Sequence, residues 1–365
     1  MAGRNGDHIT QQGQVLCDLF AKIGYPVTSA SAFPNRYLRL GDIVVTLFSQ
    51  RKHTEILIIE GYGGRSFVLE DIASWIGHRF GHRLILWLHG GSLPEFMNRF
   101  PKWTTGVLAR ADVVVTPSDF LARAVSRAGI EARIIANVID FEAYPFRHRR
   151  FVKPNLFWMR QFHQIWNPMM AIRVLNRLRA KMPDSSLVMA GSDKGLQAAV
   201  EDRARELKLN DCVRFPGFLD MAGKASEGNI ADIYINTNHV DNTPIAVVEA
   251  CAMGLPVVTT AVGGIRDFLI DRETALIVPD DDDAAMASAV EELVRNPDLA
   301  AHLSENGRRL ARRFSWEAVR PQWERLFAEL IGESSEVVTS SLSQTLAGPS
   351  GSLANATGAP MAEAS

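Results

Sequence analysis

Residues 236–264, NTNHVDNTPIAVVEACAMGLPVVTTAVGG, carry the pattern that decides how the rest of the chain is interpreted. Polar residues precede Pro244, a long apolar run follows it, and Gly254 separates that run from the strand-like sequence PVVTT. The pattern predicts a helix with Asn242 or Thr243 as its N-cap and Pro244 at its first position, where the missing amide hydrogen does no harm. A buried strand follows the helix.

The start of this helix is a candidate phosphate site, because a helix N-terminus offers unpaired N–H groups and a partial positive charge. Pro244 cannot donate, so the first donors would be the amides of Ile245 and Ala246. Two acids, Asp241 and Glu249, bracket the helix start. Glu249 is costly to bury in so apolar a segment unless groups such as sugar hydroxyls hydrogen-bond to it. On this stretch alone, an ordinary helix–strand unit with a surface glutamate explains the pattern equally well.

Composition narrows the class of protein. The chain has 365 residues, of which 47% are hydrophobic and 22% charged, as expected for a globular protein of two domains. Its net charge of −2 gives no general basic field for nucleic acid. Cys17, Cys212 and Cys251 form no CxxC pair, which fits a reducing compartment and argues against a zinc site. No stretch has the pattern of a membrane span or a signal peptide, so a cytoplasmic location is expected.

Strand and helix patterns alternate along the chain, which favours parallel sheets covered by helices on both faces. The first unit opens with an amphipathic helix at 13–24 rather than a strand, and a second unit begins after the connector YPFRHRRFVKPN at 144–155. A last helix is expected at 315–330. Strands are expected at 43–47, 56–60, 84–88, 113–116, 156–159, 187–190, 213–215, 233–236, 257–260 and 276–278. Other helices are expected at 67–80, 120–128, 168–181, 196–207 and 283–295.

Ligands of open parallel sheets bind beyond the carboxyl ends of the strands, so residues just past each strand are candidates for a site. His89, Gly90 and Gly91 follow the strand sequence LILWL, and the glycines there would let a ligand approach the backbone. His89 would then face the ligand, with loop anchoring as the structural alternative. Arg160 directly follows another strand, where a guanidinium can hold a diphosphate through two hydrogen bonds. A surface ion pair is the alternative for Arg160.

Two charged groups have simpler explanations beside functional ones. The acids at 280–283 could bind a metal, but acids also favour the positive end of a helix dipole, and a helix start is the preferred interpretation. Arg99, Lys102, Trp103 and Arg110 surround a predicted helix and could touch an anionic membrane surface. A solvated face is the preferred alternative for them.

Taken together, these motifs resemble the retaining glycosyltransferases of family 4, within the glycosyl transferases group 1, which have the GT-B fold. That family carries an E-x7-E motif, then EA-x-A-x-G-x-PVV and a Gly-Gly loop; here the first acid is Asp241 and the second is Glu249. The resemblance spans about residues 10–330. Further similar segments are LHGG (88–91), TPSDFL (116–121), VRFPGF (213–218), ALIVPDDD (276–283) and FSWEAV (314–319).

The resemblance implies an α/β protein with two Rossmann-like domains whose parallel sheets face each other across a cleft. An acceptor-side domain is expected at 1–148 and a nucleotide-sugar-binding domain at 149–314. A C-terminal helix at 315–332 would pack back on the first domain, and a disordered tail would occupy 333–365. The family's first strand is missing, which predicts either a true start upstream of Met1 or a domain edge that is compensated otherwise.

The implied site divides among the parts of a nucleotide-sugar donor. His89 and Asp241 would meet the transferred sugar and are the predicted catalytic residues, while Glu249 would hold the ribose hydroxyls. Arg160 would hold the diphosphate. The other predicted donor-binding residues are Gly90 and Gly91, Asn242 and Thr243, the Ile245 and Ala246 amides for the diphosphate, and Gly217 and Phe218 framing the base.

The implied activity is transfer, with retention of configuration, of a sugar from a UDP- or GDP-linked donor to a glycan or lipid-linked acceptor in surface polysaccharide synthesis. No metal and no other cofactor is expected, because fixed positive groups would stabilise the leaving diphosphate. The expected partners are the donor, the acceptor and, as a peripheral contact, the inner surface of the membrane; nucleic acid is not expected.

Two departures from the family pattern bear on activity. Asp241 replaces the first glutamate and is one methylene shorter, and residues 161–167 contain no lysine where the family has one. His163 could substitute for that lysine, or Arg160 could act alone. The departures leave a donor-binding but inactive scaffold or regulatory subunit as the alternative function.

Overall fold

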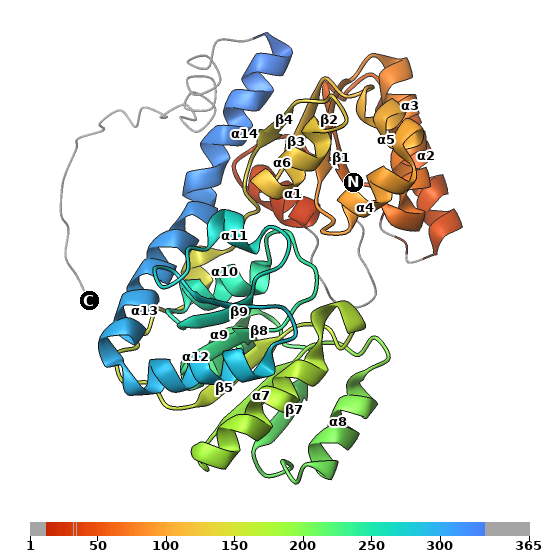
Figure 1. Ribbon diagram of the computed structural model, residues 1–365. Helices are drawn as coiled ribbons and strands as arrows, with labels where there is room; N and C mark the ends of the chain where they lie inside the picture. The colour runs from red at the N-terminus through yellow and green to blue at the C-terminus, as the bar shows by residue number, and fades with distance from the viewer. Residues whose placement is uncertain (1–11, 32, 34, 333–365) are drawn as a thin grey trace, which may run out of the picture.

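The computed structural model describes residues 12–31, 33 and 35–332, which form two α/β units, each built on a parallel sheet (Figure 1). The N-terminal sheet has strand order β1-β2-β3-β4, and the C-terminal sheet has order β10-β9-β8-β5-β6-β7. The strands are β1 Ile56–Gly61, β2 Arg83–Leu88, β3 Val113–Thr116, β4 Ala132–Ile134, β5 Asn155–Met159, β6 Ser186–Ala190, β7 Val213–Gly217, β8 Ile233–Asn236, β9 Val257–Thr260 and β10 Leu276–Val278.

Helices cover both faces of each sheet. Those of the N-terminal unit are α1 Gln12–Lys22, α2 Arg36–Gln50, α3 Phe67–Phe80, α4 Leu93–Arg99, α5 Pro101–Leu108 and α6 Asp119–Ser126. Those that follow are α7 Pro168–Lys181, α8 Gln197–Glu206, α9 Met221–Ile230, α10 Ile245–Ala252, α11 Ile265–Phe268, α12 Asp283–Arg295, α13 Pro297–Ala311 and α14 Trp316–Ile331. Alternation of strand and helix thus gives the parallel sheets that the sequence predicted.

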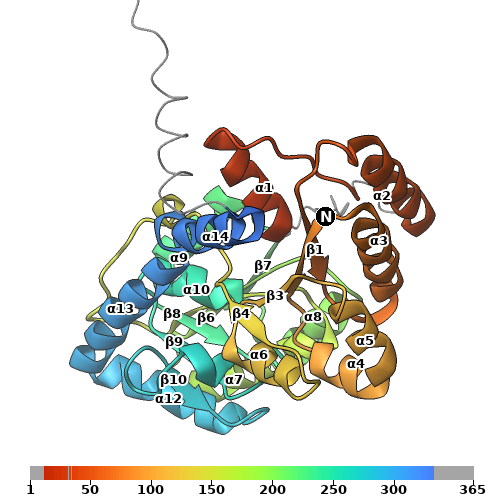
Figure 2. The ribbon, with the colours of Figure 1, turned by 90° about the horizontal axis from the view of Figure 1, so that it is seen from above.

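Strand β2 shows how the N-terminal core is divided. Leu84 and Leu86 point to the face covered by α2 and α3, whereas Ile85 and Trp87 point to the face covered by α1 and α14. Figure 2 shows α1 and α14 next to each other over this sheet. The ring of Phe20 in α1 packs on that of Trp316 in α14, with the ring centroids 5.0 Å apart. The last helix of the chain is therefore part of the N-terminal core.

Helices α13 and α14 run from one unit to the other. Leu310 of α13 belongs to the core of the C-terminal unit, while Trp323 of α14 belongs to the core of the N-terminal unit. The chain thus crosses back to its first domain at the short segment that precedes Trp316. Throughout the described ranges, no helix is long and apolar enough to span a membrane.

The strand predicted at 43–47 is wrong, because these residues form the middle of α2. Asn35 caps the helix by accepting from the amide of Tyr37 at 2.9 Å. Ile43 and Leu47, four residues apart, are buried on one side, while Val45 is 67% exposed. Helical periodicity therefore outweighs the strand preference of the β-branched run IVVT. The other nine predicted strands, and the helices predicted at 67–80, 120–128, 168–181, 196–207 and 283–295, are found within a few residues of their expected bounds, whereas strand β4 was not predicted.

Two expectations concern residues outside the described part. The tail at 333–365 lies beyond it, as do residues 1–11, so the expectation of a missing first strand stays a prediction. Within the described part, the N-terminal sheet begins in chain order with β1.

Candidate functional site

Helix α10 begins one residue later than the sequence predicted. Pro244 is the N-cap, with φ −68° and ψ 110°, and Ile245 is the first helical residue. Asn242 does not cap the helix, because its side chain bonds Ser118 and the carbonyl of His89 in the other domain. In the described structure no group accepts a hydrogen bond from the amides of Ile245 or Ala246. These two donors are open at the helix N-terminus, as a phosphate site requires.

Asp241 lies three residues before Pro244, the N-cap of this helix, and is paired with Arg160, which directly follows β5. Its carboxylate accepts from Arg160, from the side-chain amide of Asn238 and, at 2.8 Å, from the backbone amide of Asn242. Burial raises the pKa of Asp241, and the charge of Arg160 opposes that rise. The guanidinium of Arg160 also stacks over the ring of Trp166 at 4.6 Å, which holds it in place. Asp241, predicted to bind the transferred sugar, and Arg160, predicted to bind the diphosphate, are therefore in direct contact.

Glu249, two turns into α10, is buried, with 5% of its surface exposed. The hydroxyl of Tyr144 donates to it at 2.7 Å, and Lys224 of α9 donates to both carboxylate oxygens at 2.9 and 3.1 Å. A surface position for Glu249 is thereby excluded. Its carboxylate is held in the interior by two groups that sequence reasoning did not identify.

His89 directly follows β2 and packs between two aromatic rings. It stacks on Tyr62 with ring centroids 5.2 Å apart, and its ring lies 4.2 Å from that of Trp87. Nε2 is 3.4 Å from a carboxylate oxygen of Glu60, which also accepts from the hydroxyl of Tyr62 at 3.1 Å. Burial lowers the pKa of His89 to about 3. His89 is therefore a neutral imidazole at physiological pH and can donate or accept one hydrogen bond per nitrogen.

A second buried carboxylate, that of Glu70, bonds the same loop as Glu60. Glu70 of α3 is 4% exposed and accepts from the Tyr62 amide at 3.2 Å and from the Ser66 hydroxyl at 3.3 Å. Burial raises the pKa of Glu70 to about 7 and also raises that of Glu60. These acids fix the loop that follows β1 against the His89 loop.

Gly90, Gly91 and Gly263 allow protein backbones to approach one another closely, and the donor-binding role of Gly90 and Gly91 stays a prediction. A Cβ on Gly90 would lie 2.4 Å from the carbonyl oxygen of Tyr62, and one on Gly91 would lie 3.2 Å from the backbone of Asp241. Gly263, with φ +52°, approaches Asp241 from the other side, where a Cβ would lie 1.8 Å from its carbonyl oxygen. Gly90 and Gly91 thus give room for the Tyr62 and Asp241 loops.

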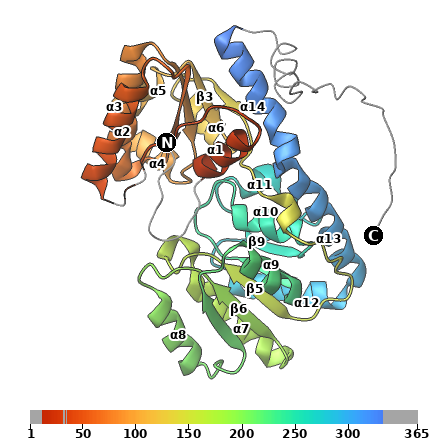
Figure 3. The same cartoon turned by 180° about the vertical axis from the view of Figure 1, so that it is seen from behind.

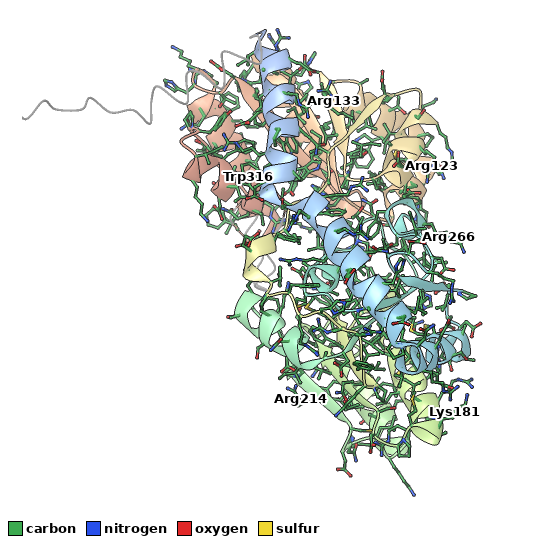
Figure 4. The ribbon with its side chains drawn as sticks, turned by 90° about the vertical axis from the view of Figure 1, so that its left-hand side faces the viewer. Arg123, Arg133, Lys181, Arg214, Arg266 and Trp316 are labelled. Carbon is green, nitrogen blue, oxygen red and sulfur yellow. The ribbon has the colours of Figure 1, made fainter. Side chains whose placement is uncertain are left out.

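The two domains are joined at this place. Asn242 links them through Ser118 and through the His89 carbonyl at 3.3 Å. Further out, Arg123 of α6 bonds both carboxylate oxygens of Asp267 in α11 at 2.8 and 3.0 Å. Figure 4 shows Arg123 beside Arg266, the neighbour of Asp267 in sequence. His89 and Asp241, 152 positions apart, are thereby placed in adjoining loops.

Buried polar atoms without a hydrogen-bond partner in the described structure gather at these strand ends. Buried polar groups normally find partners, so such a concentration is expected where a polar ligand binds. The N-terminal domain contributes Glu60 Oε2, His89 Nε2 and Asn137 Oδ1, and the C-terminal domain contributes Arg160 Nε, Ser192 Oγ, Asn236 Oδ1, Asn238 Oδ1 and Thr243 Oγ1.

The remaining predicted residues have distinct positions. Gly217 ends β7 with φ +78°, and Phe218 beyond it is 42% exposed at the same edge of the sheet. Thr243 is 6% exposed beside Asn242. His163 does not replace a lysine of the site, because it is exposed and its Nδ1 accepts from the amide of Ile165 to cap a short helical turn.

Neither of the other two charged groups points to a ligand. In the acidic run, Asp282 caps α12 by accepting from the Ala285 amide at 2.8 Å, as the helix-start interpretation predicted. Trp103 and Arg110 are not on a free membrane-facing surface, because both side chains bond Asp71 of α3. Over residues 12–31, 33 and 35–332, no three His, Cys, Asp or Glu side chains gather as a metal site would require.

Comparisons with known proteins agree with this architecture. Residues 142–310 match the family model described as glycosyl transferases group 1. Glycogen synthase of Mycobacterium tuberculosis is 27% identical over 240 residues, which cover 60% of this chain and 58% of that protein, so the alignment spans little more than half of that relative's length.

Solved structures show the same fold. Sucrose-phosphate synthase from Thermosynechococcus elongatus superposes with a TM-score of 0.72 at 18% identity, covering 88% of this chain and 93% of the other. Anabaena Alr3699/HepE, solved in complex with UDP, superposes with a TM-score of 0.68 at 16% identity, covering 81% and 84%. The fold predicted from the resemblance is confirmed. Residues 142–310, in the C-terminal domain, are thus similar to the glycosyl transferases group 1, and the two parallel sheets of the chain have the GT-B fold.

Proposed function

We propose that this protein transfers a sugar, with retention of configuration, from a nucleotide-diphosphate donor to a glycan or lipid-linked acceptor in surface polysaccharide synthesis. The observation that carries the proposal is the pairing of Asp241 with Arg160 directly before two open amides of α10. Carboxylate, guanidinium and helix N-terminus are the groups that bind sugar hydroxyls and a diphosphate.

The proposed chemistry places negative charge where the protein has fixed donors. As the bond from the sugar to the diphosphate breaks, charge develops on the phosphate oxygens, next to Arg160 and the amides of Ile245 and Ala246. Such preorganised donors stabilise the leaving group without a metal ion. A phosphate oxygen of the donor would take the proton of the acceptor hydroxyl as it attacks from the same face.

His89 has a limited role in this scheme. Because burial lowers the pKa of His89 to about 3, the ring lacks at neutral pH the second proton that an imidazolium would give as an acid. We expect one nitrogen of its imidazole to hydrogen-bond a hydroxyl of the transferred sugar. Glu60, 3.4 Å from Nε2, would orient the ring.

The donor can be identified with a panel of UDP, GDP and their sugars. A bound ligand raises the melting temperature by mass action, and hydrolysis of the labelled sugar nucleotide measures turnover. The Glu249→Ala variant is expected to bind the nucleotide about tenfold more weakly or worse, because hydrogen bonds from the ribose to a charged acceptor are lost. Glu206→Ala, at an exposed position of α8, is the control. Equal turnover by wild type and Glu249→Ala would overturn the assignment.

A donor-binding scaffold or regulatory subunit without activity is the alternative function. The observation that favours this alternative is that the carboxylate of Asp241 is already occupied by Arg160. Nucleotide binding without transfer to any acceptor, including lipid-linked extracts, would support this alternative over the enzyme.

We also propose a peripheral contact with an anionic membrane surface, through α2 rather than the Trp103 region. Tyr37, Leu38, Val45 and Phe48 of α2 are between 49% and 69% exposed. Four basic residues within 36–52 stand against one acidic residue. An exposed apolar stripe with surrounding positive charge fits an anionic bilayer.

Vesicle sedimentation tests this contact. Wild type is expected to sediment with vesicles of anionic phospholipid and not with phosphatidylcholine alone, and Phe48→Asp is expected to lose most of that binding. Ile270→Asp changes an equally exposed apolar residue, 63% exposed in the C-terminal domain, and serves as the control. Undiminished binding by Phe48→Asp would rule out α2 as the contact.

A further inference from the structure

The charge balance of the proposed donor site is unfavourable to a diphosphate if only the predicted residues are counted. Asp241 and Glu249 are both buried acids, and Arg160 is the one cation among the predicted residues. Arg160 is moreover neutralised by Asp241 in this structure. A donor diphosphate adds further negative charge, so a second cation is needed within reach of it.

Lys224 is placed to be that cation. It lies in the first turn of α9, directly after the loop at Gly217 and Phe218 that leads from the carboxyl end of β7. Its Nζ bonds both carboxylate oxygens of Glu249 at 2.9 and 3.1 Å, and a quarter of its side chain is exposed. Figure 3 shows α9 and α10, which carry these two residues, as neighbours in the C-terminal domain.

The structure thus contains two acid–cation pairs of the same kind. Asp241 is paired with Arg160, and Glu249 is paired with Lys224. In each pair a carboxylate, which can accept hydrogen bonds from sugar hydroxyls, is bonded to a cation, which can bind phosphate. The site is therefore electrically balanced as it stands, and a donor that supplies both hydroxyls and phosphates can engage all four side chains.

We propose that Lys224 is the second cation of the donor site. In this structure Lys224 bonds Glu249, and when the donor enters it binds the diphosphate of the nucleotide sugar. The inference rests on the proposed function. Ribose hydroxyls donating to Glu249 replace part of the bond from Lys224, and Tyr144, 2.7 Å away, keeps that carboxylate in place. The lysine ammonium has three donors on a flexible stem, so it can keep one bond to Glu249 and direct the others to phosphate oxygens.

A purely structural role is the competing explanation. If Lys224 only neutralises Glu249, its removal leaves a buried carboxylate unpaired and disturbs ribose binding. That loss would affect nucleoside and nucleoside diphosphate alike. If Lys224 binds the diphosphate, the loss appears only with ligands that carry it.

The test compares the affinities of Lys224→Met, Lys224→Arg and wild type for uridine or guanosine, its monophosphate and its diphosphate, by titration calorimetry. Lys224→Met is expected to bind the diphosphate about tenfold more weakly, as for the loss of a hydrogen bond to a charged group, and to bind the nucleoside within about twofold of wild type. Lys224→Arg is expected to recover most of the diphosphate affinity.

Arg214→Met is the matched control for charge. Arg214 of β7 pairs with Glu227, which lies in α9 as Lys224 does, but the side chain of Arg214 is 54% exposed. Figure 4 shows Arg214 far from α14, toward the outer end of the C-terminal domain. This variant is expected to leave all three affinities unchanged. Melting temperatures of each variant show whether it is folded.

The outcomes separate the inference from the function on which it rests. Equal loss for nucleoside and diphosphate, or no loss for either, would overturn the role of Lys224 while leaving the proposed function intact. Failure of wild-type protein to bind any nucleoside diphosphate would overturn both together.

Discussion

Replacing Arg160 by methionine is expected to slow sugar transfer by about one hundred- to one thousand-fold, the cost of removing one fixed donor from a developing negative charge. Arg160 follows β5, stacks on Trp166 and bonds Asp241, so its guanidinium is held at the start of α10 before the donor arrives. A lysine at the same position keeps the charge but loses the planar group that stacks on Trp166 and the fixed geometry in which two N–H groups bind two oxygens at once. Arg160→Lys is therefore expected to recover only part of the rate.

Asp241 makes it possible to separate loss of catalysis from loss of stability. Without Arg160 the buried carboxylate of Asp241 has lost its cation, and its pKa, already raised by burial, should rise further. Arg160→Met is therefore expected to lower the melting temperature, and Arg160→Met/Asp241→Asn to restore much of it, because no buried charge is left unpaired.

Transfer should stay slow in that double variant, since the diphosphate has still lost its donor. Recovery of both stability and rate would mean that Arg160 acts only by balancing Asp241. Asp241→Asn alone addresses the sugar: transfer at the wild-type rate would show that the role given to Asp241 is wrong.

The elements around this site were predictable because their signals are local. Buried parallel strands are continuous apolar runs, and Gly254, Pro256 and the Gly263–Gly264 pair mark where one element ends and the next begins. The run at 43–47 could not be assigned in this way. A run of five apolar and β-branched residues fits a strand or a buried helix face, and the cap at Asn35 decides for the helix.

The missing members of the site had no local signal. Tyr144 and Glu249 are 105 positions apart, and Tyr144 lies in the segment that the sequence suggested was a connector. Lys224, in the segment MAGKASEG, has the same appearance as a solvated lysine on a polar helix. Glu60 lies inside β1, one residue before its end, so the rule that selected His89 from the residues past a strand does not select it. Only tertiary contacts show that these side chains meet.

Replacing Arg149 by methionine is expected to destabilise the protein by about 3 kcal/mol or more, because several buried carbonyl groups lose their donor. Arg149 also belongs to the apparent connector, yet it is 1% exposed. All five of its N–H groups are used: they donate to the carbonyls of Arg147, Gly228, Ala231 and Met253, the last of which caps α10. Burial lowers its pKa to about 9, so it stays positively charged at neutral pH.

The position of that charge explains why the effect should be large. Gly228 and Ala231 are at the carboxyl end of α9, and Met253 is at the carboxyl end of α10, where helix carbonyls lack partners and the dipole is negative. The buried guanidinium of Arg149 thus donates hydrogen bonds to the carbonyl groups at the carboxyl ends of α9 and α10, the two helices that carry Lys224 and Glu249. Its loss should loosen both helices together, and not only the segment that contains Arg149.

Urea unfolding of Arg149→Met and Arg150→Met measures the effect with a matched control. Arg150 is the next residue and pairs with Asp298, but the two side chains are 56% and 83% exposed. An exposed pair of this kind contributes about 1 kcal/mol or less, so Arg150→Met should unfold near the wild-type midpoint. Equal midpoints for the two variants would show that water replaces the guanidinium at these carbonyls. A lower midpoint for Arg149→Met alone, with weaker nucleotide binding, would show that the site depends on the capping of α9 and α10 at their opposite ends.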